Sequence, residues 1–361
     1  MHLAWKEIKH SKKRYLLIEL TLVLLIFMVI FLSGLANGLA KAVSAAIENT
    51  TATGFLLSDD AENLITLSHV NEEQLDTIKE NTSDKVATLN IQRTNIKPID
   101  RDLKLDITYF VIHPQEFLNP DVREGKKLSS DEYLIVLDDA LKDEGIKLGD
   151  IIEDSSSGIR MKVTGFTKDS MYGHTSVGFI NTKTYHDMKT ILNPKYIDFY
   201  NTVAIQDKHD FTMNMAGLTI VEKSVIVDHL PGYAAEQTTI RMILWVLVVI
   251  SGAILGVFFY IITIQKQKQF GVMKAIGMTM GEILRIITFQ ITLLALIGAL
   301  IGNLLALGMA MFLPNSMPFY VNLQDTFIVS ITFIAISILC GLLSTIKIAK
   351  VDPLISIGGN E

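Results

Sequence analysis

The sequence predicts a membrane protein with four transmembrane α-helices and one α+β domain inserted between the first and second helix. An apolar fraction of 49% and a mean hydropathy of +0.37 exceed what a soluble domain carries. The apolar residues gather in four runs, each near the ~20 residues needed to cross about 30 Å of hydrocarbon as a helix. The runs cover 16–39, 240–264, 284–313 and 325–346. One long segment of mixed polarity separates the first run from the second.

These runs define the expected organisation of the 361 residues. The expected segments are a cytoplasmic N-terminus with transmembrane helix 1 (1–39), an extracytoplasmic domain (40–238), transmembrane helix 2 (239–264), a cytoplasmic loop (265–283), transmembrane helices 3 (284–313) and 4 (325–346), and a cytoplasmic tail (347–361). A cleaved signal peptide is the alternative for the first run, because "KHSKKR" precedes it. The length of the run and the helical continuation "AKAVSAAIEN" favour a span.

Lysine and arginine placement sets the expected orientation. Basic residues precede the first run, occur in the loop 265–283 and follow the fourth run, whereas the connection 313–325 has none. With four spans, every basic segment falls on one side, which the positive-inside rule makes the cytoplasm. Residues 41–238 carry 20 Lys or Arg and 32 Asp or Glu, a balance of −12, and the rest of the chain has a balance of +6. An acidic outside and a basic inside agree with this topology.

The inserted domain mixes strand and helix patterns without a strict βαβ repeat, which favours an α+β domain. The helix pattern "EEQLDTIKEN" and the alternating patterns of β-branched and aromatic residues are typical of short elements. Strands are expected at 54–58, 85–96, 105–113 and 199–207, a strand–helix–Gly turn–strand unit at 131–154, β alternation broken by glycine at 159–185, and a helix mixed with a strand at 212–230.

Catalytic patterns are missing from the sequence. It contains no G-x-x-x-x-G-K-[ST], H-E-x-x-H, G-x-S-x-G or C-x-x-C, and no two histidines of the domain lie at close metal-ligand spacing. The single cysteine, Cys340, lies in the fourth apolar run, so no disulfide framework is expected. We therefore expect no catalytic residue, no resident metal or cofactor, no ATP hydrolysis through a P-loop of its own, and no nucleic-acid partner.

Three of the spans carry a G-x-x-x-G motif. The motifs are "GLANG" at 34–38, "GAILG" at 252–256 and "GALIG" at 298–302. Glycines four residues apart lie on one face of a helix and let another helix approach closely. The partner helix belongs either to the same chain or to a second copy in a dimer, and the motif alone does not decide between them.

The loop "QKQKQFGVMKAIGMTMGEI" is basic and helical in pattern although it lies between two spans. The pattern predicts a short helix that breaks near Gly277, with Phe270, Met273 and Ile276 on adjacent faces. Such a helix either lies on the membrane surface or docks into a groove of a cytoplasmic partner.

Three stretches resemble the MacB/FtsX-type permeases of ABC transporters. "FGVMKAIGMTMGEI" is similar to the cytoplasmic signature of these permeases, "KIAKVDPLISI" to their C-terminal ending, and "LDDALKDEGIKLGDII" to their extracytoplasmic core. The order of one span, a large outside domain and three further spans matches as well. The resemblance covers nearly the whole chain.

This resemblance implies a mechanism called mechanotransmission. Two permease copies pair in the membrane with two cytoplasmic ATP-binding subunits, and closure of those subunits is passed through the loop into the spans, which lever the outside domains. The residues implied in coupling to the ATPase are Phe270, Gly271, Met273, Lys274, Ala275 and Gly277.

The N-terminal segment 3–40 looks most like that of the haem-efflux (HrtB-like) permeases of Gram-positive bacteria. This resemblance implies haem, or a similar toxic amphiphile, as a transported substrate. A haem site needs apolar walls, an axial ligand and a cation for the propionates. The candidates near the outer ends of the first two spans are Phe31, Leu35, Glu48, His229, Tyr233, Arg241 and Met242. The alternatives are an FtsX-like mechanical subunit that regulates a cell-wall hydrolase or sensor kinase, and an antimicrobial-peptide resistance permease.

Overall fold

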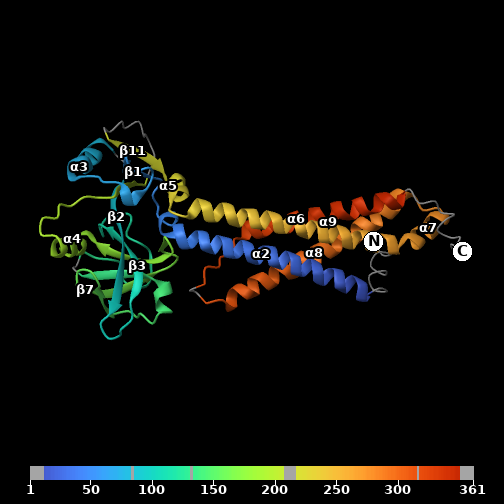
Figure 1. Ribbon diagram of the computed structural model, residues 1–361, viewed down its shortest axis with the longest axis horizontal. Helices are drawn as coiled ribbons and strands as arrows, with labels where there is room; N and C mark the ends of the chain where they lie inside the picture. Colours follow the sequence, from blue (N-terminus) through green and yellow to red (C-terminus); the bar gives the residue numbers. More distant parts are fainter. Residues whose placement is uncertain (1–11, 83–84, 131–132, 207–216, 315–316, 350–361) are drawn as a thin grey trace. The chain divides into compact units, whose positions relative to one another are not determined.

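The computed structural model describes residues 12–82, 85–130, 133–206, 217–314 and 317–349 (Figure 1). The chain divides into two compact units. The membrane unit comprises Met1–Gly38, Thr238–Pro314 and Phe319–Glu361, and the inserted domain comprises Leu39–Gln237 with Asn315–Pro318. The end of the C-terminal motif "KIAKVDPLISI" and the start of the N-terminal segment 3–40 lie outside the described residues.

Among the described residues, four helices are long and apolar enough to cross a membrane. They are α2 (Lys12–Glu48), α6 (Tyr233–Gln265), α8 (Met280–Phe312) and α9 (Leu323–Ala349). The predicted fold class, four transmembrane helices with an α+β domain between the first and second, is confirmed. The first helix continues past its apolar run to Glu48, because "GLAKAVSAAIE" contains no helix-breaking proline.

Two of the three glycine motifs pack helices of the same chain against one another. Gly298 and Gly302 of α8 lie against α2, where an added Cβ would stand 3.2 Å from Leu22 and 3.0 Å from Ile26. Gly252 and Gly256 of α6 face Ile336 and Cys340 of α9, and Gly34 of α2 faces the Phe319 ring. The second and third motifs therefore pack against another helix of the same chain, and Gly34 of the first motif packs against the connection that precedes α9.

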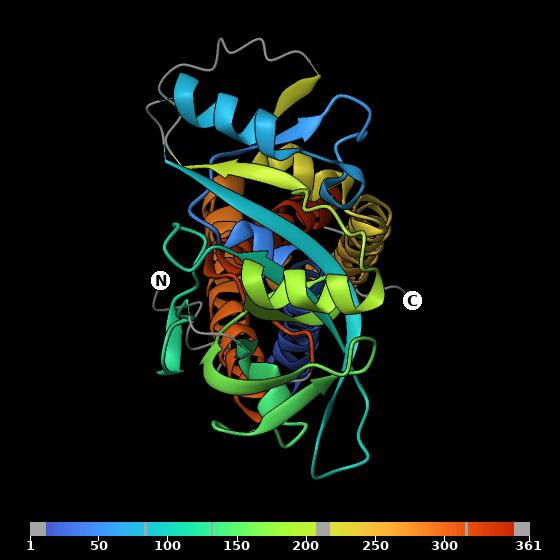
Figure 2. The ribbon, with the colours of Figure 1, turned by 90° about the vertical axis from the view of Figure 1, so that its left-hand side faces the viewer.

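In the part of the inserted domain that the structure describes, the strands form one eleven-stranded sheet, part of which faces the viewer in Figure 2. Its main path runs β11-β1-β10-β2-β3-β9-β5-β7-β4, with β6 paired to β2 and β7, and β8 paired to β9. Most pairs are antiparallel, whereas β3–β9 and β5–β7 are parallel. The strands are β1 (Gly54–Ser58), β2 (Val86–Pro98), β3 (Leu105–Ile112), β4 (Val122–Gly125), β5 (Leu134–Asp138), β6 (Ile151–Asp154), β7 (Arg160–Thr167), β8 (Met171–Tyr172), β9 (Thr175–Asn181), β10 (Thr202–Ile205) and β11 (Leu218–Glu222).

Short helices complete the domain. They are η1 (Ile65–Leu67), α3 (Glu72–Asn81), η2 (Asp139–Lys142), α4 (Thr182–Leu192) and α5 (Lys223–His229). Helix α3 begins with a capping box, in which the Asn71 side chain accepts from the Gln74 N–H and Gln74 reciprocates. Helix α4 packs on β9 and β3. The domain core includes Ala46 and Ile47 from the last turns of α2.

Two elements differ from the sequence prediction. The β alternation expected through residue 185 stops at Asn181, whose side chain accepts from the Thr184 N–H and starts α4. The helix expected after β5 is a single 3₁₀ turn, Asp139–Lys142, because Asp138 caps it and Gly145, at φ +85°, turns the chain back. In both cases an Asx side chain at the end of a strand caps the helix that follows and thereby ends the strand.

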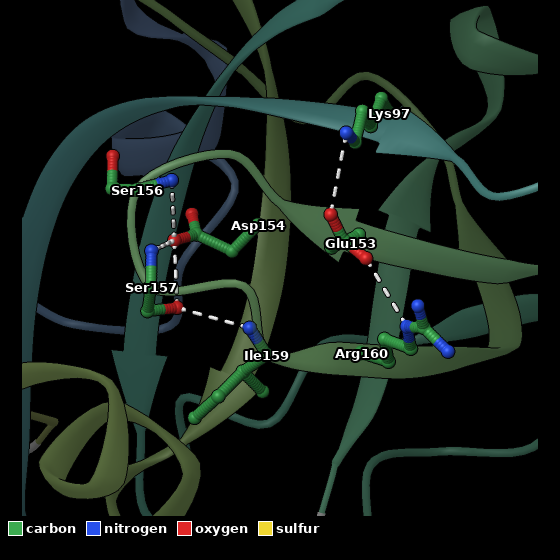
Figure 3. Close-up of polar contacts among 7 residues, drawn as sticks. All are labelled: Lys97, Glu153, Asp154, Ser156, Ser157, Ile159 and Arg160. Carbon is green, nitrogen blue, oxygen red and sulfur yellow. Dashed lines mark hydrogen bonds and ion pairs between the residues drawn. The ribbon is translucent and has the colours of Figure 1, made fainter. Parts of the chain in front are cut away.

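A buried carboxylate organises the hairpin between β6 and β7 (Figure 3). Asp154 is 3% exposed and accepts hydrogen bonds from the N–H groups of Ser156 (3.1 Å) and Ser157 (2.7 Å) and from the Ser157 hydroxyl (2.8 Å). On the other side it accepts from Thr94 Oγ1 at 2.9 Å and from the Tyr109 hydroxyl at 3.2 Å. These donors compensate the loss of water around the charge. They also join the hairpin to β2 and β3.

Replacing Asp154 with alanine is expected to destabilise the hairpin by about 3 kcal/mol, because Thr94 and Tyr109 lose their buried acceptor. Hydrogen exchange of the peptides covering β6 and β7, measured by mass spectrometry on the full chain, should show the loss. The control is Glu153→Gln on the same strand, which removes only partly exposed ion pairs to Lys97 and Arg160. Equal exchange in the two variants would contradict a structural role for Asp154.

A second buried carboxylate makes the stability of the inserted domain depend on pH. Asp138 is buried, and burial raises its pKa to about 6 although it accepts from the Ser170 and Ala140 N–H groups. The folded pKa lies above the unfolded value of about 3.9, so the folded state favours the protonated form. The preference for protonated Asp138 stabilises the folded state. This contribution to stability is fully present below the unfolded pKa and is lost as the pH rises through about 6.

The loss between pH 4 and pH 7 is expected to be about 2 kcal/mol, since the two pKa values differ by about two units, each unit corresponds to about 1.36 kcal/mol, and part of the loss has already occurred at pH 4. Asp138→Asn cannot ionise and keeps one oxygen, which accepts from one of the two N–H groups, so its stability should be lower than that of the wild type but flat over this interval. Protection factors for β5 and η2, corrected for the intrinsic exchange rate at each pH, measure the difference. A wild-type profile as flat as that of the variant would refute the prediction.

Candidate functional site

The connection between α6 and α8 forms a short helix and a tight turn. Helix α7 spans Gln267–Ala275, and Gly277 at φ +98° adopts the left-handed conformation that ends it. Thr279 then starts α8 through a capping box with Glu282, whose carboxylate accepts from the Thr279 N–H at 2.8 Å. The predicted helix that breaks near Gly277 is confirmed.

The six residues implied in coupling to an ATPase differ in their surroundings. Phe270 and Gly271 are buried, and the Phe270 ring belongs to the core of the membrane unit. Met273 and Lys274 are half-buried, whereas Ala275 and Gly277 are exposed. Phe270 and Gly271 therefore hold α7 against the spans and are not available to a partner.

Two exposed apolar side chains of this segment are not among the six residues implied in coupling, although the sequence pattern places Ile276 on a face of the predicted helix. Ile276 is 74% exposed and Val272 is 53% exposed, and both lie in the connection between two spans. Ile276 could have been recognised from the sequence as a candidate contact residue, because exposed apolar residues outside the lipid-facing helices are typical of contact surfaces.

A cavity of about 200 Å³ lies among α2, α6 and α9 of the membrane unit. Arg241 and Trp245 of α6 form part of its wall. The cavity is lined by Val29, Ser33, Arg241, Leu244, Trp245, Val248, Ile328, Val329, Thr332 and Phe333. Apolar walls with one guanidinium and two hydroxyls suit a flat amphipathic molecule that carries a carboxylate.

Of the four substrate candidates in the membrane unit, only Arg241 lines this cavity. Phe31 is half-buried and packs with the rings of Phe27 and Phe319, at centroid distances of 5.8 and 5.2 Å. Leu35 is half-buried, and Met242 is 61% exposed. None of these three is among the lining residues.

The other three candidates lie in the inserted domain, where two of them share a hollow. Glu48 and Tyr233 line a hollow of about 350 Å³, together with Lys223 of α5. The Lys223 ammonium donates to the carbonyls of Glu48 (3.1 Å) and Thr50 (2.9 Å), and burial lowers the pKa of this lysine. The Glu48 carboxylate accepts from Ser44 Oγ at 2.7 Å.

His229 does not line the hollow. Its Nδ1 lies 2.7 Å from the Val225 carbonyl, and its Nε2 lies 3.4 Å from Asn63 Nδ2. The structure therefore brings Glu48 and Tyr233 together and leaves His229 outside. Among the described residues, no group of three His, Cys, Asp or Glu side chains is arranged to hold a metal ion.

The family model described as FtsX-like permease C-terminal matches residues 241–353, from α6 to the C-terminal tail. A relative matches along the whole chain as well, with 30% identity over 362 residues, covering 100% of both chains. The chain belongs to the FtsX-like permease family. It is a membrane-spanning permease subunit of the ABC transporter class, and permeases of this class work with a separate ATP-binding subunit.

The full-length relative is "Putative hemin transport system permease protein HrtB" of Staphylococcus haemolyticus. A protein with the same description from Staphylococcus epidermidis is 28% identical over 363 residues, again covering 100% of both chains.

Two solved structures are similar in part. The periplasmic region of MacB from Actinobacillus actinomycetemcomitans is 12% identical, covers 49% of this chain and 91% of its own, and gives a TM-score of 0.36. The extracellular domain of the noncanonic ABC-type transporter YknZ from Gram-positive bacteria is 16% identical, covers 43% and 83%, and gives a TM-score of 0.32.

Proposed function

We propose that this chain is the permease of an ABC exporter that removes hemin, or a similar toxic amphiphile, from the membrane. The observation that carries the proposal is the full-length relative at 30% identity, which is described as a hemin transport permease. The chain acts as a homodimer with two ATP-binding subunits, and hemin is its cargo and not a resident cofactor.

The proposed orientation follows from charge. Both termini and α7 lie in the cytoplasm, where the basic residues gather, and the acidic inserted domain lies outside. ATP-driven closure of the partner displaces α7, and the spans carry this displacement to the inserted domain. Exposed Ile276 and Val272 support α7 as the contact with the ATP-binding subunit.

The proposed hemin site is the cavity among α2, α6 and α9 of the membrane unit. The Arg241 guanidinium pairs with a propionate, because its fork of donors matches a carboxylate, and the apolar walls of the cavity hold the ring edge. The ten residues that line the cavity include no histidine, methionine, cysteine or tyrosine to ligate the iron. Glu48 and Tyr233 line a different hollow, within the inserted domain, and are a separate candidate place for iron ligation.

The test measures ATP hydrolysis against added hemin, on the permease co-purified with its ATP-binding subunit in lipid, while the hemin Soret band is recorded. A saturable shift of the Soret band together with stimulated hydrolysis is the expected result. If the complex hydrolyses ATP and hemin changes neither signal, the hemin assignment is wrong. An FtsX-like mechanical subunit for a hydrolase or kinase, or a peptide-resistance permease, is then the better description.

A further inference from the structure

A buried lysine stands where α6 passes into α7. Lys266 is 6% exposed, although lysine is almost never buried without partners. Its N–H donates to the Ile262 carbonyl at 3.1 Å, and its own carbonyl accepts from the Phe270 N–H at 3.0 Å. The residue therefore ends the span and begins the helix that follows.

The Lys266 side chain contacts two other spans. Its ammonium donates to the Tyr15 hydroxyl of α2 at 2.6 Å and to Gln290 Oε1 of α8 at 3.1 Å. It also lies 5.2 Å from the centre of the Tyr15 ring, within the range of a cation–π contact. Tyr15 and Gln290 are themselves buried, and the Tyr15 hydroxyl donates to Gln290 Oε1 at 3.4 Å. One ammonium thus joins the base of α7 to α2 and to α8.

The surroundings of this lysine are closely packed. The adjoining cavity measures only about 20 Å³, and Phe270 of α7 is among its lining residues. That volume holds about one water, so little space is available to absorb a displacement of Phe270. Hydrogen bonds in such a low-dielectric interior are stronger than they are in water.

Stability alone does not explain a lysine at this position. An apolar side chain of similar volume in place of a buried charge is often neutral or stabilising. A membrane-anchoring role needs a charge that reaches water or lipid headgroups, and Lys266 does neither at 6% exposure. A cation at the junction of α6 and α7 that contacts both α2 and α8 fixes the positions of these two helices relative to that junction.

We infer that Lys266 is a positioning residue that passes displacement of α7 to α2 and α8 together. The inference rests on the proposed function, in which the ATP-binding subunit moves α7. When α7 shifts, the ammonium carries Tyr15 and Gln290 with it, and the ends of both spans follow as one body. Met273 also packs against the core that these helices share.

The experiment measures the distance between spin labels on α2 and α9 in the complete complex, without nucleotide and with ATP and vanadate. Cysteines replace the exposed residues Leu20 and Leu339 in a Cys340→Ser background, since the chain has a single cysteine. The wild-type permease is expected to show a nucleotide-dependent shift. Lys266→Met, close in volume and uncharged, is expected to lose it while basal ATP hydrolysis and complex formation remain.

Tyr15→Phe keeps the ring under the ammonium and removes the hydroxyl, so it serves as a second variant if Lys266→Met folds poorly. It should reduce the shift, whereas Gln290→Glu retains an acceptor and should keep it. The control is Ser344→Ala, which removes the buried 2.9 Å contact with Thr263 between α6 and α9 and leaves Lys266 intact. Its shift should equal that of the wild type.

A full shift in both Lys266→Met and Tyr15→Phe would overturn the inference. A wild-type complex that hydrolyses ATP without any shift would overturn it together with the mechanotransmission part of the proposed function. If the shift is present and depends on Lys266 but hemin does not stimulate hydrolysis, only the hemin assignment fails and the inference is supported.

Discussion

Replacing Ile276 with aspartate is expected to abolish assembly with the ATP-binding subunit. Ile276 is 74% exposed at the end of α7, where the proposed contact lies. A carboxylate buried there without a partner would cost several kcal/mol, which is enough to separate a subunit interface. Co-purification of an affinity-tagged permease with its ATP-binding subunit measures the loss, and ATP hydrolysis by the recovered complex should fall with it.

The matched control for this change is Ile197→Asp in the inserted domain. Ile197 is 83% exposed, so the same substitution is made at an equally open isoleucine outside α7. This variant should assemble as the wild type does. An intact complex in Ile276→Asp would instead show that α7 rests on the membrane surface, which is the other interpretation of its amphipathic pattern.

Replacing Arg241 with glutamine is expected to weaken hemin binding by about tenfold to a hundredfold. The loss of one charge-assisted hydrogen bond to a propionate corresponds to about 1.5–3 kcal/mol. Trp245 lines the same cavity and provides the signal, because hemin quenches a nearby indole. The chain has two tryptophans, so Trp5→Phe leaves Trp245 as the only emitter.

Two further variants test whether the effect on hemin binding is specific to the Arg241 guanidinium. Arg285→Gln removes the same charge from an exposed position of α8 that is not among the cavity-lining residues, and its affinity should match the wild type. Arg241→Lys retains the charge and loses the guanidinium fork, so an intermediate affinity is expected. Equal quenching curves for Arg241→Gln and the wild type would remove Arg241 from the hemin site.

The spans could be predicted from the sequence because hydrocarbon imposes a strict length and composition on a helix. Helix α4 could not. Thr182 and Thr184 are β-branched and extend the alternation of β9, and the Asn181 cap that ends the strand is recognised only once the backbone has turned. Local propensity and the actual element disagree there, and packing of α4 on β3 and β9 decides the outcome.

The surroundings of single candidate residues also could not be predicted from the sequence. Lys266 counted as one of the basic residues that orient the chain, yet its ammonium is buried between α2 and α8. Arg241 and Met242 are neighbours in sequence, but successive helix residues point about 100° apart and only Arg241 reaches the cavity. Residue type predicts chemistry, whereas the helix face that meets a cavity depends on packing between spans.

Helix α2 contributes to two cores, with Leu22 and Ile26 in that of the membrane unit and Ala46 and Ile47 in that of the inserted domain. This sharing has a consequence for biogenesis and for protein production. The domain core includes the final turns of the first span, so we expect that helix to be in place before the translocated domain folds. A secreted fragment cut at the apparent domain edge, near Gly54, would lack Ala46 and Ile47 and aggregate. A fragment that begins at Leu39 and ends at Gln237 keeps both, together with Tyr233, which packs against the same core.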